Sequence, residues 1–129
     1  PLGCARGLDA ASRAAYEAPF PTRAHLAGAR ALPGLVPVSP GDPAAPDNRR
    51  AWDVLRRWGK PFLCAFGDKD PITRGADRVF RKLVPGTQGQ PHATIQGAGH
   101  FLQEDRGPEL AGLVAGFVET SGVHPTPKG

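Results

Sequence analysis

In the C-terminal half of the chain, apolar and polar positions alternate in a pattern that predicts two strands, each followed by a helix. Residues 62–66 form a wholly apolar run, typical of a strand covered on both faces, and residues 92–96 alternate as a second strand. Residues 73–83 and 108–120 carry apolar side chains at helical spacing, and Pro108 suits the first turn of a helix. This order predicts two parallel strands joined by a right-handed crossover, and therefore an α/β fold.

Shorter helices are predicted in residues 1–38, an alanine-rich segment interrupted by prolines. Asp9 is placed to cap a helix over residues 10–17, and Thr22 to cap a second helix over residues 23–32. Helices of this length cannot bury their own apolar faces, so we expect them to pack against another part of the protein.

A proline-rich connection, residues 38–47, marks a boundary between two structural units. Asp47 is expected to cap the next helix, whose apolar stripe includes Trp52 and Trp58. We interpret both tryptophans as packing residues. Residues 121–129 carry two prolines and no apolar periodicity, which predicts an unfolded tail.

Composition limits the classes of protein to which the chain can belong. Of its 129 residues, 40% are apolar, a content and length that fit an ordinary domain. No stretch approaches the roughly 20 apolar residues of a membrane-spanning helix, and no signal-peptide pattern opens the chain. Cys4 and Cys64 have no metal-binding spacing, and Cys64 is expected to be a buried, reduced thiol. We therefore expect a soluble cytoplasmic protein, without membrane attachment, metal or cofactor.

The charge distribution argues against a nucleic-acid partner. Lysine and arginine outnumber acidic residues by 16 to 12, for a net charge of +4, but the arginines are spread from Arg6 to Arg106 without interleaved aromatic residues. The chain contains no Met and begins at Pro1. Our working assumption is that it is processed or is a piece of something longer.

The two predicted strands are followed by loops that carry chemically active side chains. Asp70 follows the first strand, and His100 follows the second in a loop with glycines at 97 and 99. Because the carboxyl ends of parallel strands open on one edge of a sheet, the two side chains are expected to meet there. A carboxylate bonded to one imidazole nitrogen orients the ring and leaves the other nitrogen free to accept a proton.

Each of these two residues alone has a simpler explanation. An Asp-Pro pair after a strand is most often a turn, and a histidine in a glycine-rich loop is usually a surface residue. Together, at successive strand ends, they match the last two members of an α/β-hydrolase triad. The nucleophile is missing, because Ser12, Ser39 and Ser121 lack the flanking glycines of the strand-to-helix elbow. We therefore expect the C-terminal part of an α/β-hydrolase fold.

Four blocks of sequence resemble the haloalkane dehalogenases. The first is Ala-Tyr-Glu-Ala-Pro-Phe-Pro at residues 15–21, and the second is Ala-Gly-Ala-Arg-Ala-Leu-Pro-Gly-Leu-Val at residues 27–36. The others are Gly-Asp-Lys-Asp at residues 67–70 and Gly-Ala-Gly-His-Phe-Leu-Gln-Glu at residues 97–104. The similarity extends over residues 10–120.

The resemblance implies a two-step hydrolysis of carbon–halogen bonds. In this family an Asp nucleophile displaces halide and forms an alkyl-enzyme ester, which water then hydrolyses. By position, His100 would be the base that activates water and Asp70 its acid. The Asp nucleophile and the halide-binding tryptophans would lie upstream of Pro1. The partners implied are a small apolar halogenated substrate, water, the halide product and the missing N-terminal part of the same fold.

The resemblance also implies a division into cap and core. Residues 1–38 would be the rear part of a helical cap, residues 39–120 the C-terminal part of the α/β-hydrolase core, and residues 121–129 the tail. Leu32, Pro33 and Val36 match pocket-lining positions of the cap, and Ile72 would face the pocket from the core. An apolar pocket of this kind suits neutral haloalkanes.

Two other interpretations stay open at the level of sequence. An epoxide hydrolase or a serine esterase would share the fold and the acid–histidine pair, and Tyr16 is the only tyrosine available as an epoxide hydrolase marker. Alternatively, the chain is a truncated product or a non-catalytic partner. Its strands would then leave one flank unpaired and apolar, which predicts aggregation or obligate pairing.

Overall fold

The computed structural model describes residues 3–122, which divide into two compact units. One unit combines the N-terminal segment up to Gly7 with the chain from Arg57 onward, and the other is Leu8–Arg56. Both predicted strands and both strand-end loops belong to the first unit.

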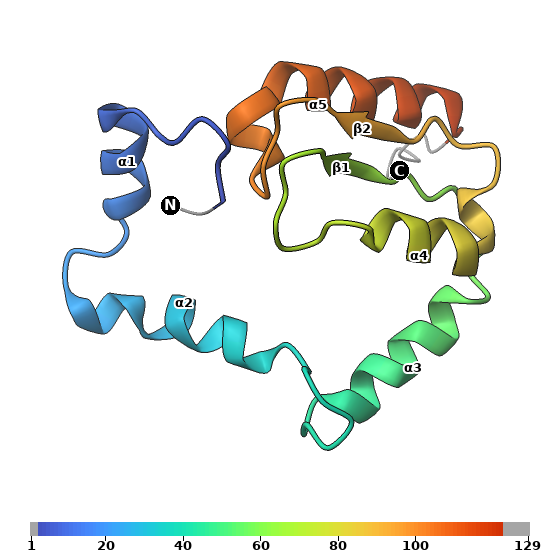
Figure 1. Ribbon diagram of the computed structural model, residues 1–129, viewed down its shortest axis with the longest axis horizontal. Helices are drawn as coiled ribbons and strands as arrows, with labels where there is room; N and C mark the ends of the chain where they lie inside the picture. The colour runs from blue at the N-terminus through green and yellow to red at the C-terminus, as the bar shows by residue number, and fades with distance from the viewer. Residues whose placement is uncertain (1–2, 123–129) are drawn as a thin grey trace, which may run out of the picture. The chain divides into compact units, whose positions relative to one another are not determined.

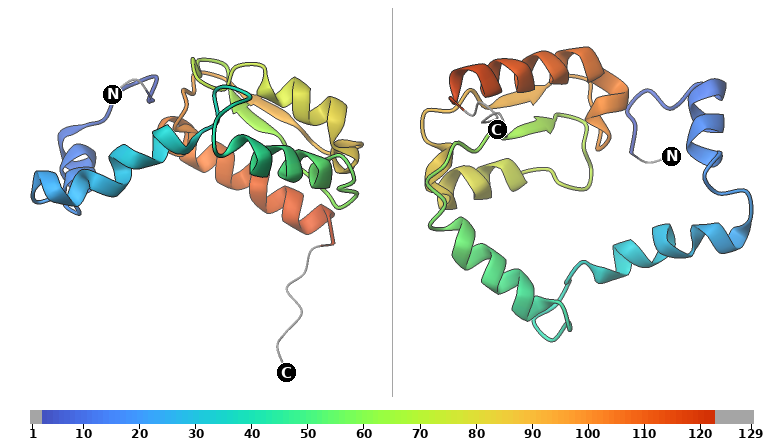
Figure 2. Two further views of the ribbon diagram at one scale, coloured as in Figure 1. Left: turned by 90° about the horizontal axis from the view of Figure 1, so that it is seen from below. Right: turned by 180° about the vertical axis from the view of Figure 1, so that it is seen from behind.

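The first unit is built on a parallel pair of strands, β1 (Ala65–Gly67) and β2 (Ala93–Ile95). In the pair, Ala65 lies opposite Ala93 and Gly67 opposite Ile95. Helix α4 (Ala76–Leu83), followed by the 3-10 turn η3 (Pro85–Thr87), lies on one side of the pair, and helix α5 (Leu102–Thr120) on the other (Figures 1 and 2). The predicted α/β class and parallel pairing are confirmed.

The first strand is shorter than its apolar run. Two N–H groups in the run donate outside the ladder: that of Phe62 to the Gly86 carbonyl at 2.9 Å, and that of Cys64 to His92 Nδ1 at 3.0 Å. The Cys64 carbonyl accepts the Ala93 N–H at 3.0 Å, so bonding to β2 begins there, but the paired register starts only at Ala65. The strand bounds predicted at residues 62–66 are therefore wrong. The run is apolar because its side chains are buried or half-buried, whether or not each residue pairs with a strand.

Helix α4 begins at Ala76, three residues later than predicted. The backbone N–H groups of Ile72 and Thr73 donate to the Asp70 carboxylate and form a turn there. Gly75 has a φ of 84°, which a helical residue does not adopt. These two features postpone the start of the helix.

Helix α5 starts earlier than predicted. A turn begins at Leu102, where the sequence pattern predicted a loop, and Arg106 interrupts it with φ of −145° and ψ of 42°. The regular helix resumes at Gly107-Pro108 and continues to Thr120, as predicted. α5 lies against both strands.

The second unit contains short helical segments only. Their bounds are α1 Ala10–Glu17, η1 Arg23–Leu26, α2 Ala27–Ala31, η2 Leu32–Leu35 and α3 Ala45–Leu55. The predicted cap of α1 is confirmed, because Asp9 Oδ1 accepts the Ser12 N–H at 2.7 Å. Thr22 makes no backbone cap; its hydroxyl bonds His25 Nδ1 at 2.8 Å instead. The helix predicted over residues 23–32 is divided into 3-10, α and 3-10 segments; Gly28 within it weakens an α-helical ladder, and Pro33, directly after it, lacks the N–H that would extend one.

The predicted cap of α3 is wrong. The helix begins at Ala45, with Pro46 in its first turn, where a missing N–H costs little, and Asp47 lies inside that turn and pairs with Arg50. The helix ends at Leu55, so Trp58 lies beyond it. There the Lys60 ammonium lies 5.7 Å from the centre of the Trp58 ring.

Few side chains of the first unit are fully buried. The buried apolar residues described in this unit are Cys64 just before β1, Val84 at the end of α4, Ile95 in β2 and Ala98 in the loop after β2. Cys64 is a free thiol, as expected, and burial raises its pKa. No helix among residues 3–122 is both long and apolar enough to cross a membrane. From residue 123 onward, the predicted tail lies outside the described residues.

Candidate functional site

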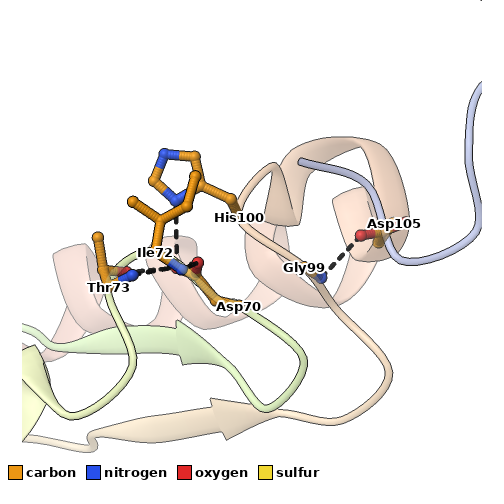
Figure 3. A network of polar contacts seen from close by, with 6 residues as sticks. All are labelled: Asp70, Ile72, Thr73, Gly99, His100 and Asp105. Atoms are coloured by element: carbon orange, nitrogen blue, oxygen red, sulfur yellow. Dashed lines mark hydrogen bonds and ion pairs between the residues drawn. The ribbon is translucent and has the colours of Figure 1, made fainter. Parts of the chain in front are cut away.

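The loops that follow β1 and β2 bring Asp70 and His100 together. The His100 Nδ1 lies 3.1 Å from Asp70 Oδ2, as the sequence predicted (Figure 3). The Asp70 side chain is 2% exposed, whereas the imidazole of His100 is 33% exposed. The acid is thus buried beneath a ring that keeps access to solvent or to a bound molecule.

Four hydrogen bonds surround the Asp70 carboxylate. Oδ1 accepts the N–H groups of Ile72 at 2.8 Å and Thr73 at 3.2 Å. Oδ2 accepts the Thr73 hydroxyl in addition to the imidazole of His100. Burial opposes ionisation of this carboxylate, but the hydrogen bonds outweigh burial and lower the pKa of Asp70 from 3.8 to about 2. Asp70 is therefore a fixed anion at neutral pH.

The neighbouring carboxylate, Asp68, serves a different purpose. Its Oδ1 accepts the Gly97 N–H at 2.6 Å, which ties the loop after β1 to the loop after β2. Burial opposes ionisation of Asp68, and hydrogen bonds from Gly97 and Lys69 lower its pKa nevertheless. Asp68 bonds the backbone of the second loop, and Asp70 alone of the two acids contacts His100.

The second loop needs glycine at positions 97 and 99, for a different reason at each. Gly97 has a φ of 70°, in the left-handed region. A Cβ at Gly99 would lie 2.6 Å from the carbonyl oxygen of Gly3, because the N-terminal segment runs directly beside the loop. Phe101 continues this contact by donating its N–H to the same Gly3 carbonyl at 2.8 Å.

Sequence reasoning missed Asp105, which anchors these two segments to each other. Its carboxylate is 8% exposed. Oδ2 accepts the N–H groups of Ala5 and Gly99, each at 2.8 Å, and Oδ1 accepts the Arg6 N–H at 3.1 Å. Burial opposes ionisation of Asp105, but these N–H donors prevail and lower its pKa. The only sequence signature was an acid five residues after the histidine, and two of its partners lie near the opposite end of the chain.

Other chemically active side chains lie elsewhere. His92 accepts the Cys64 N–H at Nδ1 and bonds the Thr87 carbonyl through Nε2 at 2.9 Å. Its ring therefore links two backbone segments and has a structural role. A polar cavity of about 430 Å³ beside α4 and η3 is lined in part by Arg78 and Arg81, and by no residue of the strand-end loops. Among residues 3–122, no three His, Cys, Asp or Glu side chains gather to hold a metal ion.

Comparison with known proteins shows which sequences this chain resembles. No protein-family profile matches the chain. A protein named haloalkane dehalogenase from Mycobacterium marinum is 58% identical over 109 residues, and one of the same name from Mycolicibacterium paratuberculosis is 57% identical over 110. A third, from Psychrobacter cryohalolentis, is 52% identical over 104 residues. The matches cover 84%, 85% and 81% of this chain, respectively.

The chain is a homologue of the haloalkane dehalogenases. It spans about a third of the length of these relatives, namely 36%, 36% and 34%, and corresponds to their C-terminal portion. The predicted resemblance and the α/β-hydrolase class are confirmed.

The pocket positions expected from the dehalogenase resemblance fall in both units. Ile72 lies in the loop of Asp70 and is 63% exposed, with its side chain directed away from the strands, as is that of His100 (Figure 3). Leu32, Pro33 and Val36 lie in or just after η2 of the second unit, and all three are exposed. Their role in lining a dehalogenase pocket stays a prediction.

Proposed function

We propose that this chain provides the acid and the base of a haloalkane dehalogenase. The observation that supports this most directly is the 3.1 Å contact between His100 Nδ1 and Asp70 Oδ2, in a chain 52–58% identical to proteins of that name. Asp70 fixes the tautomer that carries the proton on Nδ1 of His100, because its carboxylate only accepts hydrogen bonds. The unprotonated Nε2 then has its lone pair available for a proton of water.

In the proposed reaction, His100 acts in the second of two steps. First, a carboxylate nucleophile, supplied by a segment outside these 129 residues, attacks the carbon that bears the halogen. A carbon–oxygen bond forms as the carbon–halogen bond breaks, and halide leaves with the electron pair. Next, His100 Nε2 removes a proton from water as the water oxygen attacks the ester carbonyl. Asp70 stabilises the imidazolium that forms, the alcohol leaves with a proton from that imidazolium, and the carboxylic acid of the nucleophile then loses its proton to water.

The substrate class proposed is a small apolar haloalkane. The exposed side chain of Ile72 presents an apolar surface two residues from the acid. Leu32, Pro33 and Val36 are proposed to extend that surface from the cap, with residues 1–38 as its rear part and residues 39–120 as the end of the core. Exclusion of water from an apolar pocket makes a carboxylate a better nucleophile. Two free thiols, one of them buried, support a reducing cytoplasmic location.

A chimera tests the proposal without knowledge of the missing segment. The matched part of the Mycobacterium marinum relative is replaced by this chain, and halide release from a 1-haloalkane is measured. We expect turnover by the chimera and none by the 129-residue chain alone. His100→Ala in the chimera should release one halide per enzyme and then stop, because the ester forms but is not hydrolysed.

The matched control is His92→Gln, which changes a histidine whose hydrogen bonds within residues 3–122 go to backbone groups of its own unit. If folded, this variant should retain steady turnover. Sustained turnover by His100→Ala, or turnover by the chain alone, would contradict the proposed roles.

A further inference from the structure

Within residues 3–122, the Asp70 carboxylate has one side-chain partner besides His100, namely Thr73. Among the described residues, the other two hydrogen bonds to Asp70 come from backbone N–H groups, which almost any residue type would supply. The Thr73 hydroxyl depends on the identity of the residue. It donates to Oδ2, the same oxygen that accepts the imidazole.

The Thr73 hydroxyl bonds the Asp70 carboxylate and does not cap the following helix. A threonine just before a helix commonly caps it, yet α4 begins at Ala76 and has no side-chain cap. Thr73 is half-buried, and its carbonyl accepts the Ala76 N–H at 3.0 Å, which holds the residue within the turn. With its backbone bonded at both ends, Thr73 can direct its hydroxyl at Asp70 with little loss of conformational entropy.

We propose that Thr73 is a positioning residue that orients the Asp70 carboxylate and sets the strength of its hydrogen bond to His100; this rests on the function proposed above. Two donors that share one carboxylate oxygen compete for its electron density. The hydroxyl of Thr73 therefore weakens the bond from the imidazole, and together with the two N–H donors on Oδ1 it restricts rotation of the carboxylate about its Cβ–Cγ bond.

Two hydroxyl-free variants and one hydroxyl-retaining variant test this in the full 129-residue chain. Thr73→Val is isosteric, Thr73→Ala is smaller, and Thr73→Ser keeps the donor. Two NMR signals are followed in each: the ¹³C resonance of the Asp70 carboxyl as a function of pH, and the ¹H resonance of the His100 Nδ1–H. A ¹H–¹⁵N spectrum verifies that each variant is folded.

Loss of the hydroxyl should raise the pKa of Asp70 from about 2 by about one pH unit. It should also move the His100 Nδ1–H resonance downfield, because the imidazole then has Oδ2 to itself. Thr73→Ser should leave both signals near their original values. The matched control is Thr94→Val, the same substitution at an exposed position of β2, which should change neither signal. Unchanged signals in a folded hydroxyl-free variant would overturn the proposal.

The same variants in the chimera separate this inference from the proposed function. In an active chimera, Thr73→Val should change the pH profile of kcat while KM stays within about twofold, and Thr73→Ser should restore the profile. An unchanged profile would contradict the positioning role in catalysis. If the chimera is inactive while the NMR signals of the chain shift as stated, the dehalogenase assignment fails and the control of the Asp70–His100 pair by Thr73 stands.

Discussion

The Asp105 anchor makes a quantitative prediction about stability. Asp105→Asn preserves the shape of the side chain, removes its charge and converts one acceptor oxygen into a donor. If the amide oxygen replaces Oδ2, it still accepts the N–H groups of Ala5 and Gly99, but as neutral rather than charge-assisted bonds. The new NH₂ group then faces the Arg6 N–H, which loses its acceptor.

The cost follows from the hydrogen bonds. A bond to a charged acceptor contributes about 1.5–3 kcal/mol and a neutral bond about 1 kcal/mol. Two bonds are weakened and one is lost, with part of that loss recovered because Ala5 and Arg6 are exposed and water can reach their N–H groups. We expect the free energy of unfolding of this unit to fall by about 3 kcal/mol.

Urea unfolding at pH 7 measures this change. The amide signals of Ile95 and Gly99 report on the first unit specifically. The matched control is Glu109→Gln, an exposed carboxylate on the same helix with the same loss of charge. A difference between Asp105→Asn and Glu109→Gln of less than about 0.5 kcal/mol would refute the anchoring role, since surface substitutions fall within that range.

Three further predictions concern the strand ends and α5. Because the pKa of Asp70 is lowered from 3.8 to about 2, its stabilising effect is complete above pH 4 and is lost as the pH falls toward 2. Urea titrations across this range should show about 2 kcal/mol of this loss in the original chain and not in Asp70→Asn; parallel pH dependences would contradict it. Gly67→Ala would place a Cβ 2.2 Å from the Ala98 carbonyl oxygen and should lower the free energy of unfolding by about 3 kcal/mol, while an unchanged value would show that the loops separate freely. Gly112→Ala, in α5 with no atom within 4 Å of the added Cβ, should instead raise the melting temperature, by stabilising the helix about 0.5–1 kcal/mol, and a lower melting temperature would refute this.

Periodicity predicted the elements of the first unit better than it predicted their ends. The apolar run at residues 62–66 did locate a buried segment, but only Ala65–Gly67 pairs with β2. Strand bounds depend on which backbone groups find a ladder partner, and the alternative partners here, Gly86 and His92, lie more than twenty residues further along the chain. The predicted start of α4 was wrong for a similar reason. The N–H groups of Ile72 and Thr73 donate to the Asp70 carboxylate and form a turn where the helix was predicted. Helix propensities of single residues do not describe such a bond.

The pair at the centre of the site was predictable because it follows from topology. Two parallel strands place their carboxyl ends on one edge, so Asp70 and His100 had to be near each other once both strands were located. The environment of the pair was not predictable in the same way. Asp105 was missed because its donors Ala5 and Arg6 are about a hundred positions away, and nothing in local sequence connects them.

The sequence by itself determined the α/β class, the parallel pairing, the membership of Asp70 and His100 in one site and the similarity to haloalkane dehalogenases. These properties depend on the periodicity of apolar residues, the order of the strands and short motifs, all of which can be identified from neighbouring positions in the sequence. Only the tertiary structure decided how the acid is held. Ile72 and Thr73 are near Asp70 in the sequence, but their donors reach its carboxylate only in the backbone conformation of this turn. The anchor at Asp105 exists only after the N-terminal segment has packed beside the loop of His100.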